Sequence, residues 1–350
     1  MKTIKDLDFK NQTVLVRVDY NVPINNKKVT DDLRIRASLP TIDYLLENGA
    51  GRLVLISHLG RPKGKEVEDF SLSPIADSLE RLLPGVKIGF YPLPKPGEKL
   101  SIPKDVKIAL LENLRFDPRE EENNPDFIKN IVDSVSASAF VQDGFAVVHR
   151  AHASTDAIKN FLPVYAGFLL ENEVKNLTKA LENPEHPVVL IIGGSKVEDK
   201  EPLIEKFIPL ADHILVGGKI AADGYQSKNP KITVASDFDE DSTGHKLDVG
   251  PFSTADFVEI IKDAKTIIWN GCLGKVEDPA FSTASSIVAD AIGKNQGATT
   301  IICGGDTTGF VENYLKDHSD LHYSLISTGG GAALEFLLGK DLPGLRCVES

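Results

Sequence analysis

The sequence predicts an α/β protein with parallel sheets in two domains. Along its 350 residues, short apolar runs alternate with helical patterns, and glycines or polar residues follow the runs directly. A run that is apolar at every position is typical of a strand buried on both faces of a parallel sheet. The alternation with helices indicates βαβ units, and a chain of this length can hold two cores.

The predicted strands follow the apolar runs in order. In the first half they are Thr13–Val18, Leu53–Ser57, Val86–Phe90, Val106–Leu111 and Ala139–Val141. In the second half they are Val188–Ile192, His213–Val216, Thr266–Trp269, Thr299–Cys303 and Tyr323–Ser327. Helices are expected between them. Ser73 is predicted to cap a helix that runs to Leu82 with Pro74 in first position, and Gly49 is expected to end another.

Composition excludes several classes of function. The net charge is −12 and the pI about 5.2, which argues against nucleic acid and against an anionic membrane surface as partners. Cys272, Cys303 and Cys347 have no paired or metal-type spacing, as expected of a protein from a reducing cytosol. No signal region and no apolar run of membrane-spanning length is visible.

The segment 187–200, PVVLIIGGSKVEDK, carries the first functional signal. An apolar strand stops at Gly193-Gly194, and Lys196 and Lys200 follow at a spacing that shares one helix face. Glycines allow the backbone to approach a ligand, and helix-terminal amides with ammonium groups form a phosphate site. A plain βα turn with solvated lysines is the alternative, and the segment is not a P-loop.

Ligands of such sheets bind at the carboxyl ends of the strands. In the first half these ends are rich in His and Arg, which suit a small, multiply charged anion. In the second half they are rich in Gly with Lys, Asp and Thr, which suit a nucleotide held by backbone amides. Asp306 is a candidate ligand for Mg²⁺ on the phosphates. Two substrates on two domains, one a nucleoside polyphosphate, indicate phosphoryl transfer.

Each signal also has a structural explanation. Arg17, Arg34, Arg36 and Arg61 could be surface arginines, and Asp19 and Asn21 could form a turn before Pro23. In the same way His58 could be hydrogen-bonded at a strand end, Gly329–Gly331 a loop without ligand, and Asp306 a helix cap. The acidic run Glu120–Glu122 is interpreted as solvated loop. Seven such matches, all at strand ends, favour the functional interpretation.

With these residues in place, the chain resembles the phosphoglycerate kinases from end to end. The matching motifs of the first half are RVDYNVP (17–23), DDLRIRASLPTI (31–42), SHLGRP (57–62), LLENLRF (110–116) and HRAHAST (149–155). Those of the second half are GGSKVEDK (193–200), ILVGG (214–218), LDVGP (247–251), WNGCLG (269–274), GGDT (304–307) and STGGGAALEFLLGKDLPGL (327–345).

The resemblance implies two Rossmann-like domains joined by a linker helix and hinge. Residues 1–167 would bind 3-phosphoglycerate or 1,3-bisphosphoglycerate, residues 168–185 would form the linker, and residues 186–335 would bind MgADP or MgATP. The C-terminal segment, from about residue 336 to 350, would return to the first domain. A hinge-bending, cytoplasmic monomer of glycolysis is expected.

Family roles carry over onto matching positions. The residues expected to hold the phosphoglycerate are Asp19, Asn21, Arg34, His58, Arg61, Arg115 and Arg150. Those expected to hold the nucleotide are Lys196, Lys200, Gly217, Gly218, Asn270, Glu277, Gly304, Gly305, Asp306 and Thr307, with Asp306 also serving Mg²⁺. A carboxylate nucleophile needs no general base, so catalysis is expected from alignment and charge neutralisation by Arg34, Lys196 and the amides around Gly330.

The chain also departs from the family pattern. It is short, with the missing length mainly after Gly218, and Cys272 and Lys275 stand where the family usually has proline and an apolar residue. We therefore expect an active enzyme with an altered nucleotide preference. A catalytically impaired nucleotide-binding relative is the alternative. An NAD-dependent dehydrogenase fits the architecture only, because the first βα turn lacks G-x-G-x-x-G.

Overall fold

The computed structural model describes residues 1–6 and 8–349 and divides into two compact units. The first unit holds residues 1–172 together with the chain from Asp341 onward, and the second holds Glu173–Lys340. Helix α5 (Phe168–Glu182) begins in the first unit and ends in the second. None of the helices among the described residues has the length and apolar character that a bilayer span requires.

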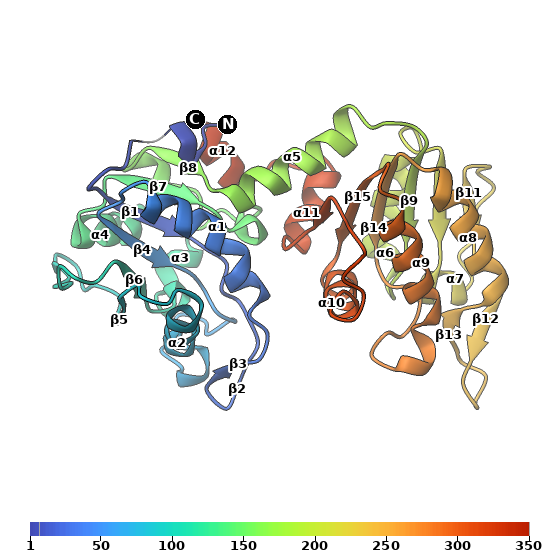
Figure 1. Ribbon diagram of the computed structural model, residues 1–350, viewed down its shortest axis with the longest axis horizontal. Helices are drawn as coiled ribbons and strands as arrows, with labels where there is room; N and C mark the ends of the chain where they lie inside the picture. The colour runs from blue at the N-terminus through green and yellow to red at the C-terminus, as the bar shows by residue number, and fades with distance from the viewer. Residues whose placement is uncertain (7, 350) are drawn as a thin grey trace. The chain divides into compact units, whose positions relative to one another are not determined.

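The first unit is built on a six-stranded sheet in the order β5-β6-β4-β1-β7-β8, and every pairing in it is parallel (Figure 1). Its strands are β1 (Thr13–Arg17), β4 (Arg52–Ile56), β5 (Ile88–Tyr91), β6 (Ile108–Leu111), β7 (Ala139–Gln142) and β8 (Val164–Ala166). A small hairpin, β2 (Ile24–Asn25) with β3 (Lys28–Val29), follows β1. The predicted strands lie within about two residues of the observed bounds.

The helices of the first unit connect these strands. They are α1 (Leu33–Glu47), α2 (Ser73–Leu82), α3 (Pro118–Glu121), α4 (Pro125–Val135) and α12 (Pro343–Glu349). As expected, Gly49 follows the end of α1 with a φ of +92°. Helix α12 contacts β8 and lies beside the N-terminus (Figure 1), so the return of the C-terminal segment to this unit is confirmed.

Two predictions in this unit are wrong in detail. Helix α2 already includes Ser73, and its N-cap residue is Leu72, which has no side-chain cap hydrogen bond, although the hydroxyl of Ser71 accepts from the Ser73 amide at 3.2 Å. Glu120 is fully buried instead of solvated. It belongs to α3, which Asp117 caps by accepting from the Arg119 amide, and this short helix turns Glu120 inward.

The second unit repeats the architecture with six parallel strands in the order β11-β10-β9-β14-β15-β16. The strands are β9 (Val188–Ile192), β10 (His213–Val216), β11 (Ile232–Val234), β14 (Thr266–Asn270), β15 (Thr299–Cys303) and β16 (Leu325–Ile326), with a hairpin of β12 (Phe238–Glu240) and β13 (Lys246–Val249). Its helices are α6 (Val197–Phe207), α7 (Gly218–Ala222), α8 (Pro251–Asp263), α9 (Thr283–Lys294), α10 (Gly305–Tyr314) and α11 (Gly331–Leu337).

The crossover from β10 to β11 is unusually short. It occupies residues 217–231, and its helix α7 has only five residues. A connection between parallel strands needs a dozen or more residues, so this one is close to the minimum. The shortening inferred after Gly218 therefore keeps all six strands of the sheet and affects only the connection between β10 and β11.

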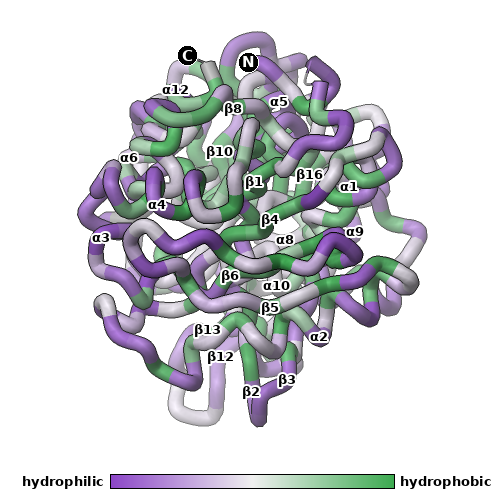
Figure 2. Tube along the Cα trace, turned by 90° about the vertical axis from the view of Figure 1, so that its left-hand side faces the viewer, coloured by the Kyte–Doolittle hydropathy of each residue, from purple (hydrophilic) through white to green (hydrophobic). Residues whose placement is uncertain are grey.

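The cores lie along the sheets. Every residue of β9 and of β14 is buried, and Figure 2 shows hydrophobic colouring along strands and hydrophilic colouring on outer loops. Trp269 in β14 is fully buried, and its indole Nε1 donates to the carbonyl of Gly271 at 2.8 Å. The largest side chain of the core thus also fixes the loop after its own strand.

A buried carboxylate anchors the start of α5. Asp143, directly after β7, accepts hydrogen bonds from the Thr41 hydroxyl at 2.9 Å and the Leu169 amide at 3.0 Å. It is fully buried, and this burial raises its pKa to about 7. The helix amides favour the charged form, but the loss of hydration outweighs them.

The stability of the first unit is expected to fall as the pH rises from about 4 to about 7. A carboxyl whose pKa is higher folded than unfolded stabilises the fold fully below its unfolded pKa of about 4, and loses this contribution as the pH passes the folded value. We expect a loss of up to about 4 kcal/mol, since each pKa unit corresponds to about 1.4 kcal/mol.

Urea unfolding between pH 5 and 8 measures this effect, with Asp143→Asn as the comparison. The asparagine keeps an acceptor for Thr41 and Leu169 without the titration, so its unfolding midpoint should vary less over this range. Equal pH dependence in both proteins would contradict the assignment to Asp143.

Candidate functional site

The first unit gathers basic side chains at the carboxyl edge of its sheet. Asp19 and Asn21 follow β1, His58 follows β4, Arg115 follows β6 and Arg150 follows β7. These four strands are neighbours in the sheet, so residues far apart in sequence meet at one edge.

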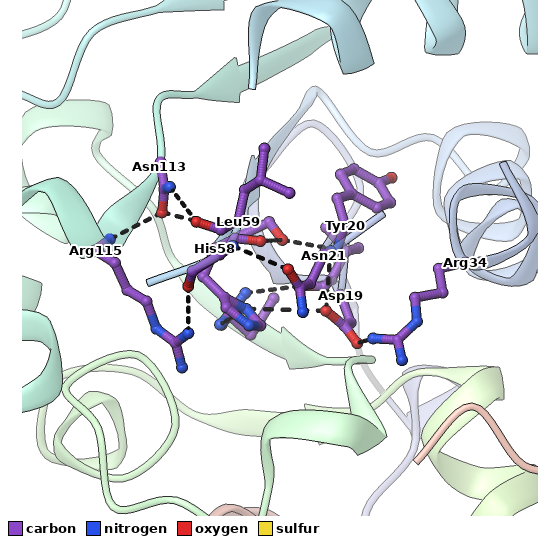
Figure 3. Close-up of polar contacts among 12 residues, drawn as sticks. Asp19, Tyr20, Asn21, Arg34, His58, Leu59, Asn113 and Arg115 are labelled. Carbon is purple, nitrogen blue, oxygen red and sulfur yellow. Dashed lines mark hydrogen bonds and ion pairs between the residues drawn. The ribbon is translucent and has the colours of Figure 1, made fainter. Parts of the chain in front are cut away.

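The loop after β1 organises this edge (Figure 3). The Asp19 carboxylate forms an ion pair with Arg34 from α1 and accepts from the amide of Asn21 at 3.1 Å. Asn21 in turn accepts from the amide of Gly60 at 2.9 Å. This bond links the loop after β1 to the loop that carries Arg61, whose side chain is exposed.

His58 is a buried histidine among cations. Only 5% of it is exposed, and the Arg17 Nη2 atom lies 3.2 Å from its Nδ1 atom. Burial first, then the charges of Arg17 and the other nearby arginines, hold the pKa of His58 well below its usual value. The imidazole is therefore neutral at pH 7, and the positive charge of the site comes from guanidinium groups.

Arg115 presents unused donors to this edge. Its Nη1 atom donates to the carbonyl of Gly60 at 2.7 Å, and its Nε atom lies 3.2 Å from a carboxylate oxygen of Glu121. Its Nη2 atom is buried without a hydrogen-bond partner among the described residues. Burial and the charge of Arg150 lower the pKa of Arg115 to about 10, so it stays protonated and can donate to an anion.

Sequence reasoning missed the residue that holds the loops of this site. Asn113 is fully buried. Its Nδ2 atom donates to the carbonyls of Leu59 at 2.7 Å and Phe70 at 2.9 Å, and its Oδ1 atom accepts from the amides of Leu59 and Arg115 (Figure 3). Its position between a strand and Arg115 was the available signal, but its partners Leu59 and Phe70 are separated from it by more than 40 residues.

The second unit contains a cavity of about 490 Å³ at the carboxyl edge of its sheet. Seven of the residues expected to hold a nucleotide line it: Lys196, Lys200, Glu277, Gly304, Gly305, Asp306 and Thr307. Asn270 lies just behind, where its Oδ1 atom accepts from Lys200 and its Nδ2 atom contacts the sulfur of Cys303 at 3.2 Å. Gly217, Gly218 and Gly330 are outside the lining.

Glycines allow the walls of this cavity to approach closely. Gly271 has a φ of +103°, and a Cβ atom there would lie 2.1 Å from the carbonyl oxygen of Gly193. The amide of Gly271 donates to the Thr307 hydroxyl at 2.8 Å, and the amide of Gly194 donates to the carbonyl of Cys272 at 2.8 Å. The loops after β9 and β14 are thus fastened together, which only glycine permits.

The lining is suited to phosphate groups. Helices α6 and α10 begin at the cavity, with Lys196 and Gly304 as their N-cap residues, and first-turn amides there can donate to an anion. Among the residues described, no group of three or more His, Cys, Asp or Glu could hold a metal ion. Mg²⁺ usually binds through one or two carboxylates and the substrate phosphates, and Asp306 in this cavity fits such a role.

Comparisons with known proteins agree with this geometry. A family model described as phosphoglycerate kinase matches residues 4–233 and 220–340. The chain is 40% identical over 400 residues to a phosphoglycerate kinase of Moorella thermoacetica, covering 98% of both chains. To the one of Bifidobacterium longum it is 40% identical over 410 residues, covering 100% of both.

Solved structures are similar over the whole chain as well. The phosphoglycerate kinase of Coxiella burnetii has a TM-score of 0.82 at 34% identity, with 99% of this chain and 98% of that chain covered. The one of Pyrococcus horikoshii has a TM-score of 0.85 at 27% identity, with 100% and 98% covered. An alignment over 400 residues with a chain of 350 leaves at least 50 positions without a counterpart here (400 − 350). The two matched segments of the family model join at 220–233, after Gly218.

Gly271→Ala is expected to disrupt the cavity, because the added Cβ atom collides with backbone that β9 holds in place and because alanine resists this φ. We expect a loss of at least about 2 kcal/mol in unfolding free energy and no detectable nucleotide binding by calorimetry.

The matched control is Gly309→Ala, since a Cβ atom inside α10 meets nothing within 4 Å. It should bind nucleotide like the parent protein. Nucleotide binding by Gly271→Ala at the parental affinity would show that the loops are not fastened as described.

Proposed function

Since the chain belongs to the phosphoglycerate kinase family, which transfers a phosphoryl group reversibly between 1,3-bisphosphoglycerate and ADP, we propose how its residues divide this work. The first unit holds the phosphoglycerate, and the second holds the nucleotide. One observation carries the proposal. Guanidinium groups gather at the carboxyl edge of the first unit's sheet, and a cavity lined by glycines and lysines lies at the carboxyl edge of the second unit's sheet.

In the first unit the arginines bind the acidic groups of the substrate. Arg115 offers its buried, unpartnered Nη2 atom, and Arg34, Arg61 and Arg150 supply further forks that match phosphate and carboxylate oxygens. Neutral His58 contributes a hydrogen bond without a charge. Asp19 orients Arg34, and Asn21 keeps the loop of Arg61 in place.

In the second unit the phosphates occupy the end of the cavity lined by Lys196, Lys200 and the amides of Gly304 and Gly305. Asp306 would hold Mg²⁺, which supplies positive charge to the phosphate oxygens, and Thr307 supports the neighbouring loop through Gly271. The opposite end, with Glu277, would hold the nucleoside. Gly217 and Gly218, which are outside the lining of the cavity, would stand behind that end.

In the direction of ATP use, a carboxylate oxygen of 3-phosphoglycerate attacks the γ-phosphorus atom. A bond forms between this oxygen and phosphorus, and the bond from phosphorus to the bridging oxygen of ADP breaks. A carboxylate has no proton to lose at neutral pH, so the protein supplies alignment and charge. Arg34 and Lys196, with amides near Gly330, are the groups we assign to the transferring phosphoryl group.

The reaction requires that the two bound substrates meet, and we propose hinge bending for this step. The segment that begins at Ser327 is tied to α5, because Thr328 donates from its amide at 2.7 Å and from its hydroxyl at 3.0 Å to Glu173. This contact makes α5 and that segment our candidates for the hinge. A cytosolic monomer is the state we propose, in keeping with three buried cysteines that are not paired in disulfides.

The nucleoside end of the cavity supports an altered base preference. Lys219, Lys246 and Lys275 line it together with Leu247, Val276 and Glu277. An ammonium group only donates hydrogen bonds. A 6-oxopurine offers two acceptors, O6 and N7, whereas the 6-amino group of adenine is a donor. We therefore propose that GTP and GDP serve at least as well as ATP and ADP.

The proposed roles predict that ADP release from MgATP depends on 3-phosphoglycerate and falls by about 10²–10³ in Arg34→Ala and in Lys196→Ala, the usual cost of losing one group that stabilises developing charge. Arg36→Ala and Lys206→Ala, which change exposed side chains of the same type nearby, are the matched controls. Absence of turnover in a protein that binds both ligands would contradict the catalytic role and favour the impaired relative.

For base preference, kcat/KM is expected to be at least as high for GTP as for ATP. Lys275→Val, which removes one donor from the nucleoside end, should shift the GTP to ATP ratio toward ATP by about tenfold, the discrimination expected from a good contact to one base edge. The surface change Lys294→Ala should not alter the ratio. A strong preference of the parent protein for ATP would refute the proposal while leaving the kinase activity in place.

A further inference from the structure

A chain of buried polar groups runs beneath the basic edge of the first unit. It consists of Glu120 in α3, Ser154, Arg17 at the end of β1, and His58. Their exposed fractions are 0%, 0%, 1% and 5%. A carboxylate and a guanidinium this deeply buried are costly unless each is paired and hydrogen-bonded.

The direction of each hydrogen bond follows from chemistry. A guanidinium has donors only. The Arg17 Nη2 atom, 3.2 Å from His58 Nδ1, therefore donates, and Nδ1 must accept. A neutral imidazole that accepts at Nδ1 carries its proton on Nε2. The contact with Arg17 thus selects one tautomer of His58.

The other half of the chain holds Arg17 in place. Its Nε atom donates to the Ser154 hydroxyl at 3.0 Å, and that hydroxyl donates its own hydrogen to Glu120 Oε1 at 2.5 Å. The second carboxylate oxygen, Oε2, accepts from the Ser154 amide at 3.0 Å. Both oxygens of Glu120 are thus used, and the orientation of Ser154 leaves its oxygen free to accept from Arg17.

Within this chain of hydrogen bonds, Glu120 is the negative group opposite the positive charge of Arg17. Burial raises the pKa of Glu120, and the charges of Arg17 and Arg115 together with the hydrogen bonds from Ser154 act against this rise and favour the charged form. The Nδ1 atom of His152 lies 3.9 Å from Glu120 Oε1, but burial and the nearby arginines lower the pKa of His152 to about 3, so it adds no charge at neutral pH. Asp19, whose Oδ1 atom lies 3.9 Å from His58 Nδ1, is itself paired with Arg34 through its other carboxylate oxygen.

We propose that Glu120 is a positioning residue, which acts through Ser154 and Arg17 to hold His58 as the neutral tautomer with its proton on Nε2. In this state the imidazole offers a single donor, and no positive charge, to the ligand at this edge. That the ligand is the phosphoglycerate rests on the function proposed above. The hydrogen-bond chain and the tautomer do not depend on it.

The first test is nitrogen NMR of the full chain labelled at histidine, compared with Glu120→Gln, Ser154→Ala and the exposed neighbour Glu122→Gln as control. In the parent protein, His58 should show an unprotonated Nδ1 and a protonated Nε2 that do not titrate between pH 5 and 8. In the first two variants we expect mixed tautomers or titration within this range. A protonated Nδ1 in the parent protein overturns the proposal.

The second test separates positioning from folding. Because a donor that binds ground state and transition state equally affects KM alone, both variants should raise KM for 3-phosphoglycerate by about tenfold and leave kcat and the KM for nucleotide within about twofold. In a His58→Ala background, Glu120→Gln should cause no further rise in KM for 3-phosphoglycerate. If Glu120→Gln fails to fold, Ser154→Ala decides the question alone.

An unchanged KM together with unchanged His58 signals in a folded Ser154→Ala protein refutes the proposal. Absence of any 3-phosphoglycerate turnover in the parent protein would instead count against the proposed function, since the NMR result stands apart from activity.

Discussion

The parallel register of the central strands is the constraint on which both sites depend. In the first sheet Arg17 is level with Ile56 of β4 and with Gln142 of β7. In the second, Ile192 is level with Val216 of β10 and with Asn270 of β14. Residues that follow these positions emerge side by side, because all the strands end at one edge. A slip of one residue would turn the side chains to the opposite faces.

The two candidate sites offer anions different kinds of partner within an acidic chain. The first uses guanidinium groups whose positions depend on buried hydrogen bonds, so it recognises shape as well as charge. The second uses backbone amides, lysines and close glycine contacts, which leave room for a larger ligand. Both concentrate positive charge locally, while the chain as a whole carries −12.

Much of this arrangement could be predicted from the sequence. Continuous apolar runs identified the strands of both sheets except the edge strands β8 and β11, and the residues after them identified the carboxyl edges, because both signals are local. The burial of Glu120 could not be predicted this way. A run of three acids is usually solvated, and only contacts with Arg17 and Ser154, 103 and 34 residues away (120 − 17 and 154 − 120), make a buried carboxylate acceptable.

The neutral state of His58 and the loop-holding role of Asn113 were hidden for the same reason, since their partners come from other strands. The cap of α2 was misplaced for a local reason instead, because the helix already begins at Ser73 and Leu72 precedes it as N-cap residue without a side-chain hydrogen bond. The shortened crossover after Gly218 was visible in the sequence only by comparison with a family pattern. Its consequence, a five-residue helix between two paired strands, is a structural result.

The packing of α12 against the first unit has a consequence for biosynthesis. Its residues are made after the whole of the second unit, yet Cys347 and Val348 are each 1% exposed in the first unit. The second unit is in effect inserted into the first. A nascent chain can complete the inserted unit while the outer one still lacks this helix, so the first unit can finish its core only after the second unit has been made.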